Sequence, residues 1–260
     1  MIFTKIIFSD FDNTMFEHSS PDDTAKNLTA IKRWREAGNL FVITTGRGEE
    51  SLRAIMPNYE EYADYCVLCD GNMINYPSGT LYNISSFGEE LAKKLNDTFA
   101  NCNFAHGRAM ICFEPGSEKS RVTADTCKVR LWFTSALDCT MSERILMERF
   151  GDELEFLTYY YASFNDDIRL DWIEPTMFHI IEVTKRGINK SAGIRELLSR
   201  LGIHNPNRII TIGDGKNDIG MVEDFNGYAV GHAAPELYER VPEDKIVRHL
   251  HELIAKKLSP

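Results

Sequence analysis

The alternation of apolar and polar positions divides the chain into short buried runs and amphipathic stretches. Residues 5–9 (KIIFS) form an apolar run that ends in acidic residues, as expected of a buried parallel strand. A helix should follow, because Ser20 suits an N-cap, Pro21 suits the first helical position and Gly38 suits the end. Residues 40–44 (LFVIT) are then predicted to form a second strand.

The strand–helix–strand order continues on both sides of a long central stretch. The pattern predicts these further elements: a helix over 49–56, a strand over 65–69, a helix over 190–201, a strand over 208–212, a short helix near 219, a strand over 228–230 and a closing amphipathic helix over 243–258. This order is typical of an open parallel sheet, whose ligand site lies at the carboxyl ends of the strands.

The central stretch has a different pattern of apolar and polar residues. It combines two helical segments, near 91–99 and 141–150, with alternating runs such as KVRLWFT, LEFLTYYYAS, IRLDW and FHIIEV. At 260 residues the chain is long enough for one large domain or two smaller ones. We therefore predict an α/β core domain over 1–82 and 186–260, and an inserted α+β domain with an antiparallel sheet over 83–185.

Composition excludes several classes of protein. The chain is 43% hydrophobic and 26% charged, and it has no apolar run long enough to cross a bilayer, which argues against a membrane protein. The N-terminus lacks the apolar stretch and cleavage site of a secretory signal, so we expect a cytoplasmic protein. The net charge of −10 argues against nucleic-acid binding, and any phosphate site must be built locally from a metal ion, a Lys or Arg, and backbone amides.

Six cysteines are present, and most of them lie in apolar runs, so we expect them to be reduced. Cys66 and Cys69 form a CxxC pair, which suits zinc binding or redox chemistry. No second CxxC or CxxH pair follows at a suitable spacing, which favours two residues of a buried strand.

Asp10 and Asp12 are the first residues that suggest chemistry. They lie two positions apart at the end of the first strand, so their carboxylates share a side and repel each other unless a cation lies between them. Magnesium suits such a site because it prefers oxygen ligands. A polar strand end without function is the alternative for this motif alone.

Two further loops also place polar residues and glycines directly after a predicted strand. Residues 213–218 (GDGKND) follow the predicted strand RIITI, and their glycines permit close backbone approach, although a tight turn alone would use the same residue types. Residues 44–47 (TTGR) end the second strand and offer a hydroxyl and backbone amides to phosphate oxygens. Loops at one edge of a parallel sheet would share a site.

Together these residues resemble the haloacid dehalogenase superfamily, over residues 5 to about 82 and 190 to about 230. Its four motifs occur in order: Asp10-Phe11-Asp12-Asn13-Thr14, Thr45 of the TGR run, Lys190 in GINKSAGI, and Gly213-Asp214 with Asn217 and Asp218. The resemblance implies a Rossmann-like parallel-sheet core and a magnesium-dependent phosphatase.

The resemblance also implies a role for each motif residue. Asp10 would be the nucleophile that forms an aspartyl-phosphate, and Asp12 the general acid and then base. Magnesium would be bound by Asp10, by the backbone carbonyl of Asp12 and by Asp214, while Asp218 would support that shell or orient Lys190. The phosphoryl group would be held by Thr45, Gly46, Lys190 and Asn217.

The insertion lies between the second and third motifs, which in this superfamily marks a type 2 cap. The mixture of strands and helices looks like the Cof-type subfamily, many of whose members hydrolyse sugar phosphates, and CDGNMINYPSGTLY resembles the hairpin leading into such caps. After the fourth motif the chain departs from the subfamily: many members have an Asn-Ala pair near a glycine and a TxxNxxxGV stretch, where this chain has FNGYAVGHAAPELYERVPED.

Several assignments stay open. A phosphomutase or phosphotransferase would use the same aspartates, and a regulator that binds a phosphorylated metabolite would keep Asp10 without a general acid. Ordinary strand composition accounts better than substrate contact for the polar and aromatic residues of the insertion, namely Arg169, Asp171, Trp172 and the run 159–161. The histidines, including His179 and His232, show no metal-ligand pairing. The resemblance implies a small phosphorylated substrate whose identity the cap would set.

Overall fold

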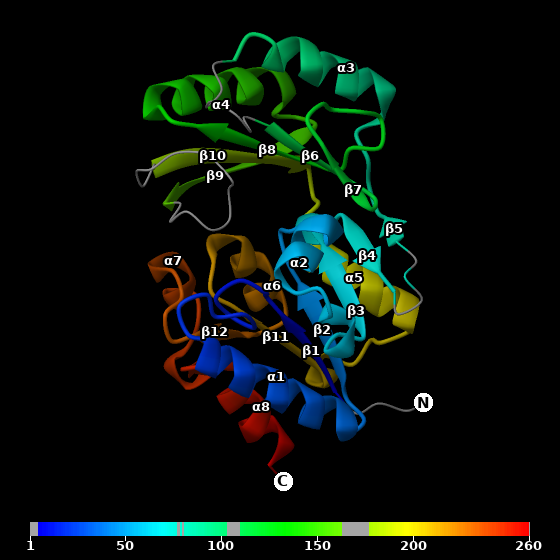
Figure 1. Ribbon diagram of the computed structural model, residues 1–260, viewed down its shortest axis with the longest axis vertical. Helices are drawn as coiled ribbons and strands as arrows, with labels where there is room; N and C mark the ends of the chain where they lie inside the picture. Colours follow the sequence, from blue (N-terminus) through cyan, green and yellow to red (C-terminus); the bar gives the residue numbers. More distant parts are fainter. Residues whose placement is uncertain (1–4, 77–78, 80, 103–109, 163–176, 260) are drawn as a thin grey trace. The chain divides into compact units, whose positions relative to one another are not determined.

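A computed structural model describes residues 5–76, 79, 81–102, 110–162 and 177–259 (Figure 1). The chain forms two compact units. The core unit contains the chain up to Ile84 and from Ile188 onward, and the inserted unit is Ser85–Gly187. Each unit has its own sheet.

The core unit is built on an eight-stranded sheet with the order β13-β12-β11-β1-β2-β3-β4-β5. Its parallel strands are β1 (Ile6–Ser9), β2 (Leu40–Thr44), β3 (Tyr65–Leu68), β11 (Ile209–Gly213), β12 (Tyr228–Val230) and β13 (Ile246–Val247). A hairpin of β4 (Met73–Asn75) and β5 (Leu81–Asn83) extends one side of the sheet with antiparallel pairing.

The register of the sheet brings the predicted motif loops to one edge. Ser9, the last residue of β1, pairs with Ile43 of β2 and with Ile212 of β11. The residues that follow these three strands therefore emerge side by side at their carboxyl ends. The predicted parallel core is confirmed, and it explains how motifs distant in sequence share one location.

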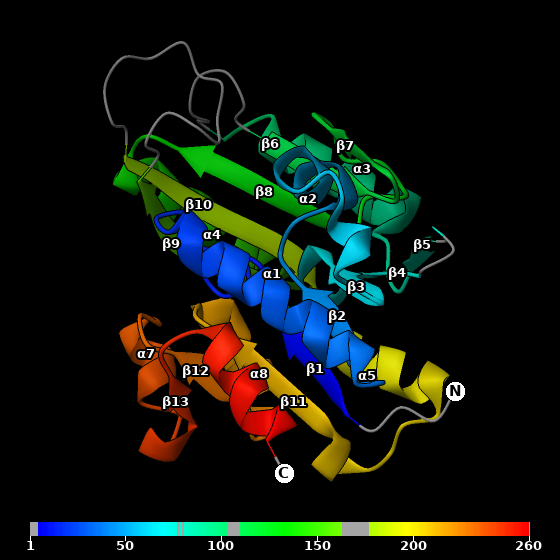
Figure 2. The same ribbon diagram turned by 60° about the horizontal axis from the view of Figure 1, so that its bottom comes forward.

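Helices flank this sheet (Figures 1 and 2). They are α1 (Pro21–Glu36), α2 (Glu49–Ile55), α5 (Lys190–Leu201), α6 (Ile219–Asp224), α7 (Pro235–Tyr238) and α8 (Leu250–Leu258). The start of α1 follows the sequence prediction, because the Ser20 side chain accepts a hydrogen bond from the Asp23 backbone and Pro21 is the first helical residue. Helices α1 and α8 pack against each other, which joins the beginning and the end of the chain.

The predicted closing helix over 243–258 is wrong in its first half. The structure has a 3-10 turn at Glu243–Lys245, then β13, and α8 begins only at Leu250. Ile246 and Val247 pair in parallel with β12 at the end of the sheet. Both residues are β-branched and favour a strand, and this pairing outweighs the helical spacing of their side chains.

The inserted unit contains a five-stranded antiparallel sheet with the order β7-β6-β8-β10-β9, as the alternating runs predicted. Its elements are α3 (Gly88–Phe99), β6 (Met110–Glu114), β7 (Ser117–Lys119), β8 (Lys128–Phe133), α4 (Ala136–Phe150), β9 (Leu154–Ala162) and β10 (Met177–Lys185). Apolar residues of α3 and α4 pack with alternate residues of β8 and β10 in one hydrophobic core.

Some predictions about the insertion lie outside the described residues. These are the IRLDW run and the side chains of Arg169, Asp171, Trp172 and Tyr160–Tyr161. All six cysteines are free, with Cys66 in β3 and Cys69 in the turn that follows it, so the CxxC pair forms no disulfide. Within the described ranges, no helix combines the length and apolar character needed to cross a membrane.

Candidate active site

The carboxylate cluster of the site consists of Asp10, Asp214 and Asp218. Asp10 directly follows β1, its backbone N–H donates to the Ile212 carbonyl at 2.9 Å, and the residue is only 6% exposed. One ligand oxygen from each of the three side chains lies within 4.8 Å of the others. The structure therefore brings together acids from the first and fourth motifs, which are about 200 residues apart in the sequence.

Burial dominates the electrostatics of this cluster. It raises the pKa of Asp10 well above the usual value; Lys190 opposes the shift, and the neighbouring carboxylates Asp218, Asp214 and Asp12 add to it. The pKa of Asp214 is raised to about 6 by burial and by the charge of Asp218. Without a cation the cluster resists full ionisation, and its donors are all oxygens, so the residues present fit a hard divalent ion such as magnesium.

Lys190 places a positive charge inside this acidic cluster. It is the first residue of α5, whose N-terminus is capped by the Asn189 side chain, and only 1% of it is exposed. Its Nζ lies 2.5 Å from Asp10 Oδ1 and 2.6 Å from Asp218 Oδ1. Burial alone would lower the pKa of Lys190, but the charges of Asp10 and Asp218 outweigh it and raise the pKa above its ordinary value.

Asp218 uses both of its carboxylate oxygens within the loop. Oδ1 accepts from Lys190, while Oδ2 accepts from the backbone N–H groups of Asp214 at 3.0 Å and Gly215 at 2.8 Å. Of the two implied roles, these contacts favour orientation of Lys190 and of the Asp214 turn. Direct metal ligation by Asp218 remains a prediction.

The carboxylate of Asp12 is bound differently from that of Asp10. Arg47 donates two hydrogen bonds to this carboxylate, from Nε to Oδ2 at 2.8 Å and from an Nη to Oδ1 at 2.7 Å. His18 Nε2 also lies 2.8 Å from Oδ1. Burial opposes ionisation of Asp12, but the hydrogen bonds from His18 and Arg47 prevail and hold its pKa well below the usual range. These contacts therefore favour the ionised form of Asp12.

Sequence reasoning missed both partners of Asp12. The TTGR pattern assigns phosphate contacts to its hydroxyl and backbone amides and no role to the Arg47 side chain. An arginine in a loop at the same sheet edge as a carboxylate is a usable signal, because a guanidinium matches a carboxylate in two-point geometry. His18 offers no comparable signal, since its approach to Asp12 depends on the path of the intervening loop.

The second-motif residues follow β2 as predicted. The Thr45 backbone N–H donates to the Val67 carbonyl at 2.8 Å, and its hydroxyl oxygen accepts from the Arg47 backbone at 3.1 Å. Thr45 is buried and Gly46 is half-buried. In the described structure no hydrogen bond joins Thr45 to Asp10, so the grouping of Thr45 and Gly46 with Asp10 rests on the common sheet edge.

Asn217 contacts an acid that the sequence prediction omitted. Its Nδ2 donates to Asp70 Oδ1 at 3.1 Å. Asp70 is 8% exposed, has φ 53° and follows β3, and its charge contributes to the raised pKa of Lys190. A buried carboxylate in left-handed backbone geometry at this edge marks a constrained position.

Comparison with known proteins agrees with the geometry. Residues 7–247 match the model of the haloacid dehalogenase-like hydrolase family. A Bacillus subtilis (strain 168) protein named "Putative phosphatase YkrA" is 24% identical over 270 aligned positions, which cover 96% of this chain and 98% of that protein. A second protein of the same strain, "5-amino-6-(5-phospho-D-ribitylamino)uracil phosphatase YitU", is 34% identical over 105 residues, 37% of each chain.

Solved structures share the fold at low sequence identity. A "putative HAD/COF-like hydrolase" from Plasmodium vivax has a TM-score of 0.73 at 20% identity, covering 97% of this chain and 95% of its own. TM0651 from Thermotoga maritima has a TM-score of 0.72 at 17% identity, covering 100% and 98%. The chain thus belongs to the haloacid dehalogenase-like hydrolases.

Proposed function

We propose that this chain is a magnesium-dependent phosphatase that hydrolyses a small phosphorylated metabolite through an aspartyl-phosphate at Asp10. One observation carries the proposal: Asp10, Asp214, Asp218 and Lys190 converge at the carboxyl edge of the parallel sheet. A nucleophilic carboxylate, other carboxylates and one ammonium group are the groups that phosphoryl transfer requires.

In the first step an Asp10 oxygen attacks phosphorus and the ester P–O bond breaks, and the departing alcohol takes a proton from Asp12. Asp12 therefore enters this step protonated, which requires bound substrate to displace the His18 and Arg47 hydrogen bonds that favour its ionised form in the free protein. In the second step Asp12 takes a proton from water, which attacks the acyl phosphate, breaks its P–O bond and releases inorganic phosphate and Asp10. Lys190 faces the Asp10 oxygen and neutralises part of the phosphoryl charge.

Magnesium would be held by Asp10, by the backbone carbonyl of Asp12 and by Asp214, and when bound it would neutralise charge on the phosphoryl oxygens. The residues of this chain then have separate tasks. Asp218 keeps Lys190 in place, and Thr45, Gly46 and Asn217 are proposed to bind the phosphoryl oxygens. Arg47 and His18 keep Asp12 in the ionised form, which is the form needed to accept a proton from water.

The proposed substrate is a phosphate ester of a sugar or related polyol. The general support is the family, and the specific support is that one relative is named for a phosphate ester on a ribityl chain. That relative matches only 37% of this chain, so the support concerns the substrate class and not the particular compound.

The test is inorganic phosphate release from a panel of sugar phosphates, polyol phosphates, nucleotides and cofactor phosphates, with magnesium and with a chelator. Magnesium-dependent release from a narrow group of polyol or sugar phosphates is the expected result. Migration of phosphate within a substrate, without release, would indicate a phosphomutase instead. Saturable binding without release or migration would indicate a regulator.

A further inference from the structure

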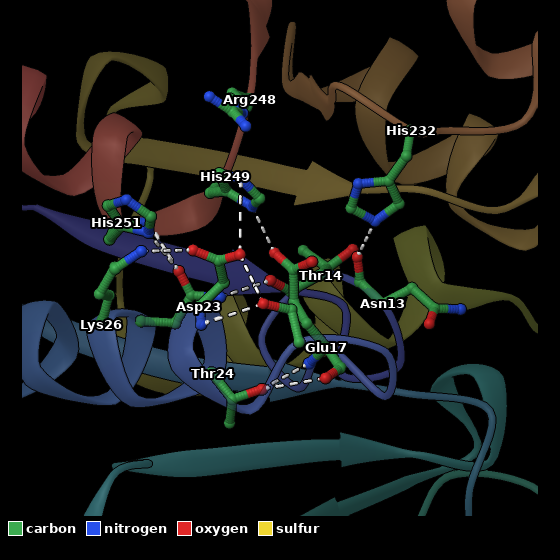
Figure 3. A network of polar contacts seen from close by, with 12 residues as sticks. Asn13, Thr14, Glu17, Asp23, Thr24, Lys26, His232, Arg248, His249 and His251 are labelled. Carbon is green, nitrogen blue, oxygen red and sulfur yellow. Dashed lines mark hydrogen bonds and ion pairs between the residues drawn. The ribbon is translucent and has the colours of Figure 1, made fainter.

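We propose that His232 and His249 are positioning residues that fix the nucleophile loop, defined here as residues 10–17, from the C-terminal part of the chain. The inference rests on the proposed phosphatase function and adds to it two residues outside the four motifs. Figure 3 shows the polar network in which they lie.

His232 holds the loop next to Asp12. Its Nε2 lies 2.6 Å from the carbonyl oxygen of Asn13 (Figure 3). A carbonyl only accepts, so Nε2 carries the hydrogen of this bond. Asn13 has φ 55°, a left-handed conformation that asparagine adopts more readily than most residues, and the hydrogen bond from His232 holds the carbonyl of this turn.

His249 holds the end of the same loop. Its Nδ1 lies 2.6 Å from Glu17 Oε1, and its Nε2 lies 4.0 Å from Asp23 Oδ2. The ring stacks on His251, with centroids 5.3 Å apart and an interplanar angle of 11°. Glu17 is 6% exposed, so its carboxylate depends on a donor inside the protein, and the structure supplies His249.

The backbone between these two points is also held from outside the loop. Asn27 is fully buried, and its Nδ2 lies 3.2 Å from the carbonyls of both Thr14 and Met15. Asn27 Oδ1 in turn accepts from the backbone N–H of His251 at 2.9 Å. Side chains from α1 and the segment 232–251 thus bind consecutive carbonyls of the loop.

This support reaches the carboxylate cluster through Thr14. The Thr14 hydroxyl donates to Asp214 Oδ1 at 3.1 Å, and Asp10 and Asp12 are in the same loop. A shift of the Asn13 peptide would therefore move the Asp12 carbonyl and the Thr14 hydroxyl together. Residues that orient metal ligands in this way commonly change metal affinity or activity ~10- to 100-fold when removed.

The experiment uses the full chain with His232→Ala and His249→Ala, the conservative variants His232→Asn and His249→Gln, and His204→Ala as the control. His204 is exposed and forms no hydrogen bond or ion pair in the described structure. Each protein is measured for thermal unfolding with a chelator, for the magnesium concentration that gives half of the maximal stabilisation, and for kcat and KM on an aryl phosphate.

Both alanine variants are expected to need ~10-fold more magnesium and to lose ~10- to 100-fold in kcat with little change in KM. The conservative variants should recover part of both losses, and the control should match wild type. The proposal would be overturned if both alanine variants had the magnesium dependence and the kcat of wild type. This includes the case in which their melting temperature with chelator falls but neither magnesium dependence nor kcat changes.

The design separates this proposal from the proposed function. If wild type is stabilised by magnesium but releases no phosphate from any substrate, the phosphatase proposal fails, and the magnesium titration still decides whether His232 and His249 position the loop.

Discussion

At the scale of single residues, one lysine shares a small buried volume with several carboxylates. Lys190 contacts Asp10 and Asp218, while Asp12 is held apart by Arg47. The two motif-one aspartates therefore have opposite pKa shifts, upward for Asp10 and downward for Asp12, although they are two residues apart. Groups whose environments separate their pKa values in this way suit different chemical roles.

The raised pKa of Asp214 predicts how magnesium stabilisation depends on pH. In the metal-free protein this pKa is about 6, above the ordinary value of 3.8. Its contribution to folding is therefore present at pH below about 4 and is lost as the pH rises through about 6. The proposed magnesium ion would bind the deprotonated carboxylate, so its affinity should fall ~10-fold per pH unit below pH 6.

The measurement is the difference in melting temperature with and without magnesium at pH 5, 6, 7 and 8. We expect the difference to grow as the pH rises from 5 through 6 to 7, since Asp214 loses its proton over this range. An equal difference at all four values would contradict the assignment of Asp214 as a titrating metal ligand.

The site residues that sequence predicted are those with a fixed place relative to a strand end. Asp10 and Asp214 each follow a parallel strand directly, so their convergence follows from the sheet. The sequence analysis missed two contacts that depend on backbone paths after the strand ends. Asp70 reaches Asn217 through the turn that follows β3, and His18 reaches Asp12 through the loop after β1. Loop geometry leaves no periodic signal, so those contacts required the structure.

At the scale of elements, a close contact between backbones positions Lys190. Helix α5 approaches the turn after β3 so closely that a Cβ on Gly193 would lie 2.6 Å from Gly71 Cα and 2.7 Å from a Val67 methyl carbon. Only glycine permits this approach, and Gly71 also has φ 101°. Lys190 lies at the start of the same helix, so this packing sets its distance from Asp10.

We predict that Gly193→Ala destabilises the protein and lowers activity. Alanine is intrinsically the better helix former by about 1 kcal/mol, but the clash with the Gly71 backbone should cost up to about 3 kcal/mol, which leaves a net destabilisation of up to about 2 kcal/mol. The melting temperature should fall by several degrees, and kcat should fall because α5 is displaced.

Gly220→Ala is the matched control for Gly193→Ala. A Cβ there would have no neighbour nearer than 4.0 Å, in the Ser191 side chain, so the substitution should be neutral or stabilising. Equal effects of both substitutions would contradict the role assigned to the contact between Gly71 and Gly193.

The helix and strand predictions are correct where the spacing of apolar residues agrees with the residue types that begin and end a helix. Helix α1 has an N-cap, a proline at its first position and a glycine after its end, and its start matches the prediction. The prediction failed at Ile246–Val247, where two apolar residues fit a helical face but pair with β12 instead. Pairing at the end of a sheet is a tertiary effect that a local pattern does not contain.

At the scale of the whole molecule, each unit has a sheet and a hydrophobic core of its own. Both ends of the insertion meet the core unit at one location. The backbone N–H of Ile84 donates a hydrogen bond to the Asn72 carbonyl at 2.7 Å. The Asn189 carbonyl approaches the adjacent residue Gly71 so closely that a Cβ there would lie 2.1 Å from its oxygen. A short linker could therefore join Ile84 to Ile188 at a small cost in loop entropy.

We predict that the core unit folds without the inserted unit. Replacing Ser85–Gly187 by a short Gly-Ser linker should give a monodisperse protein with cooperative thermal unfolding and retained stabilisation by magnesium. Calorimetry with and without magnesium is the measurement, and full-length protein is the control. Aggregation or non-cooperative unfolding of the shortened chain would contradict the prediction.

The central claim is that Asp10 is the nucleophile, and the most direct test compares phosphate release by wild type and Asp10→Asn. The amide keeps the size of the side chain but is a poor nucleophile, so release should fall by at least ~1000-fold while the fold persists. Asp125→Asn, at an exposed position of the inserted unit, is the control and should match wild type. Near-normal turnover by a folded Asp10→Asn variant would contradict the account.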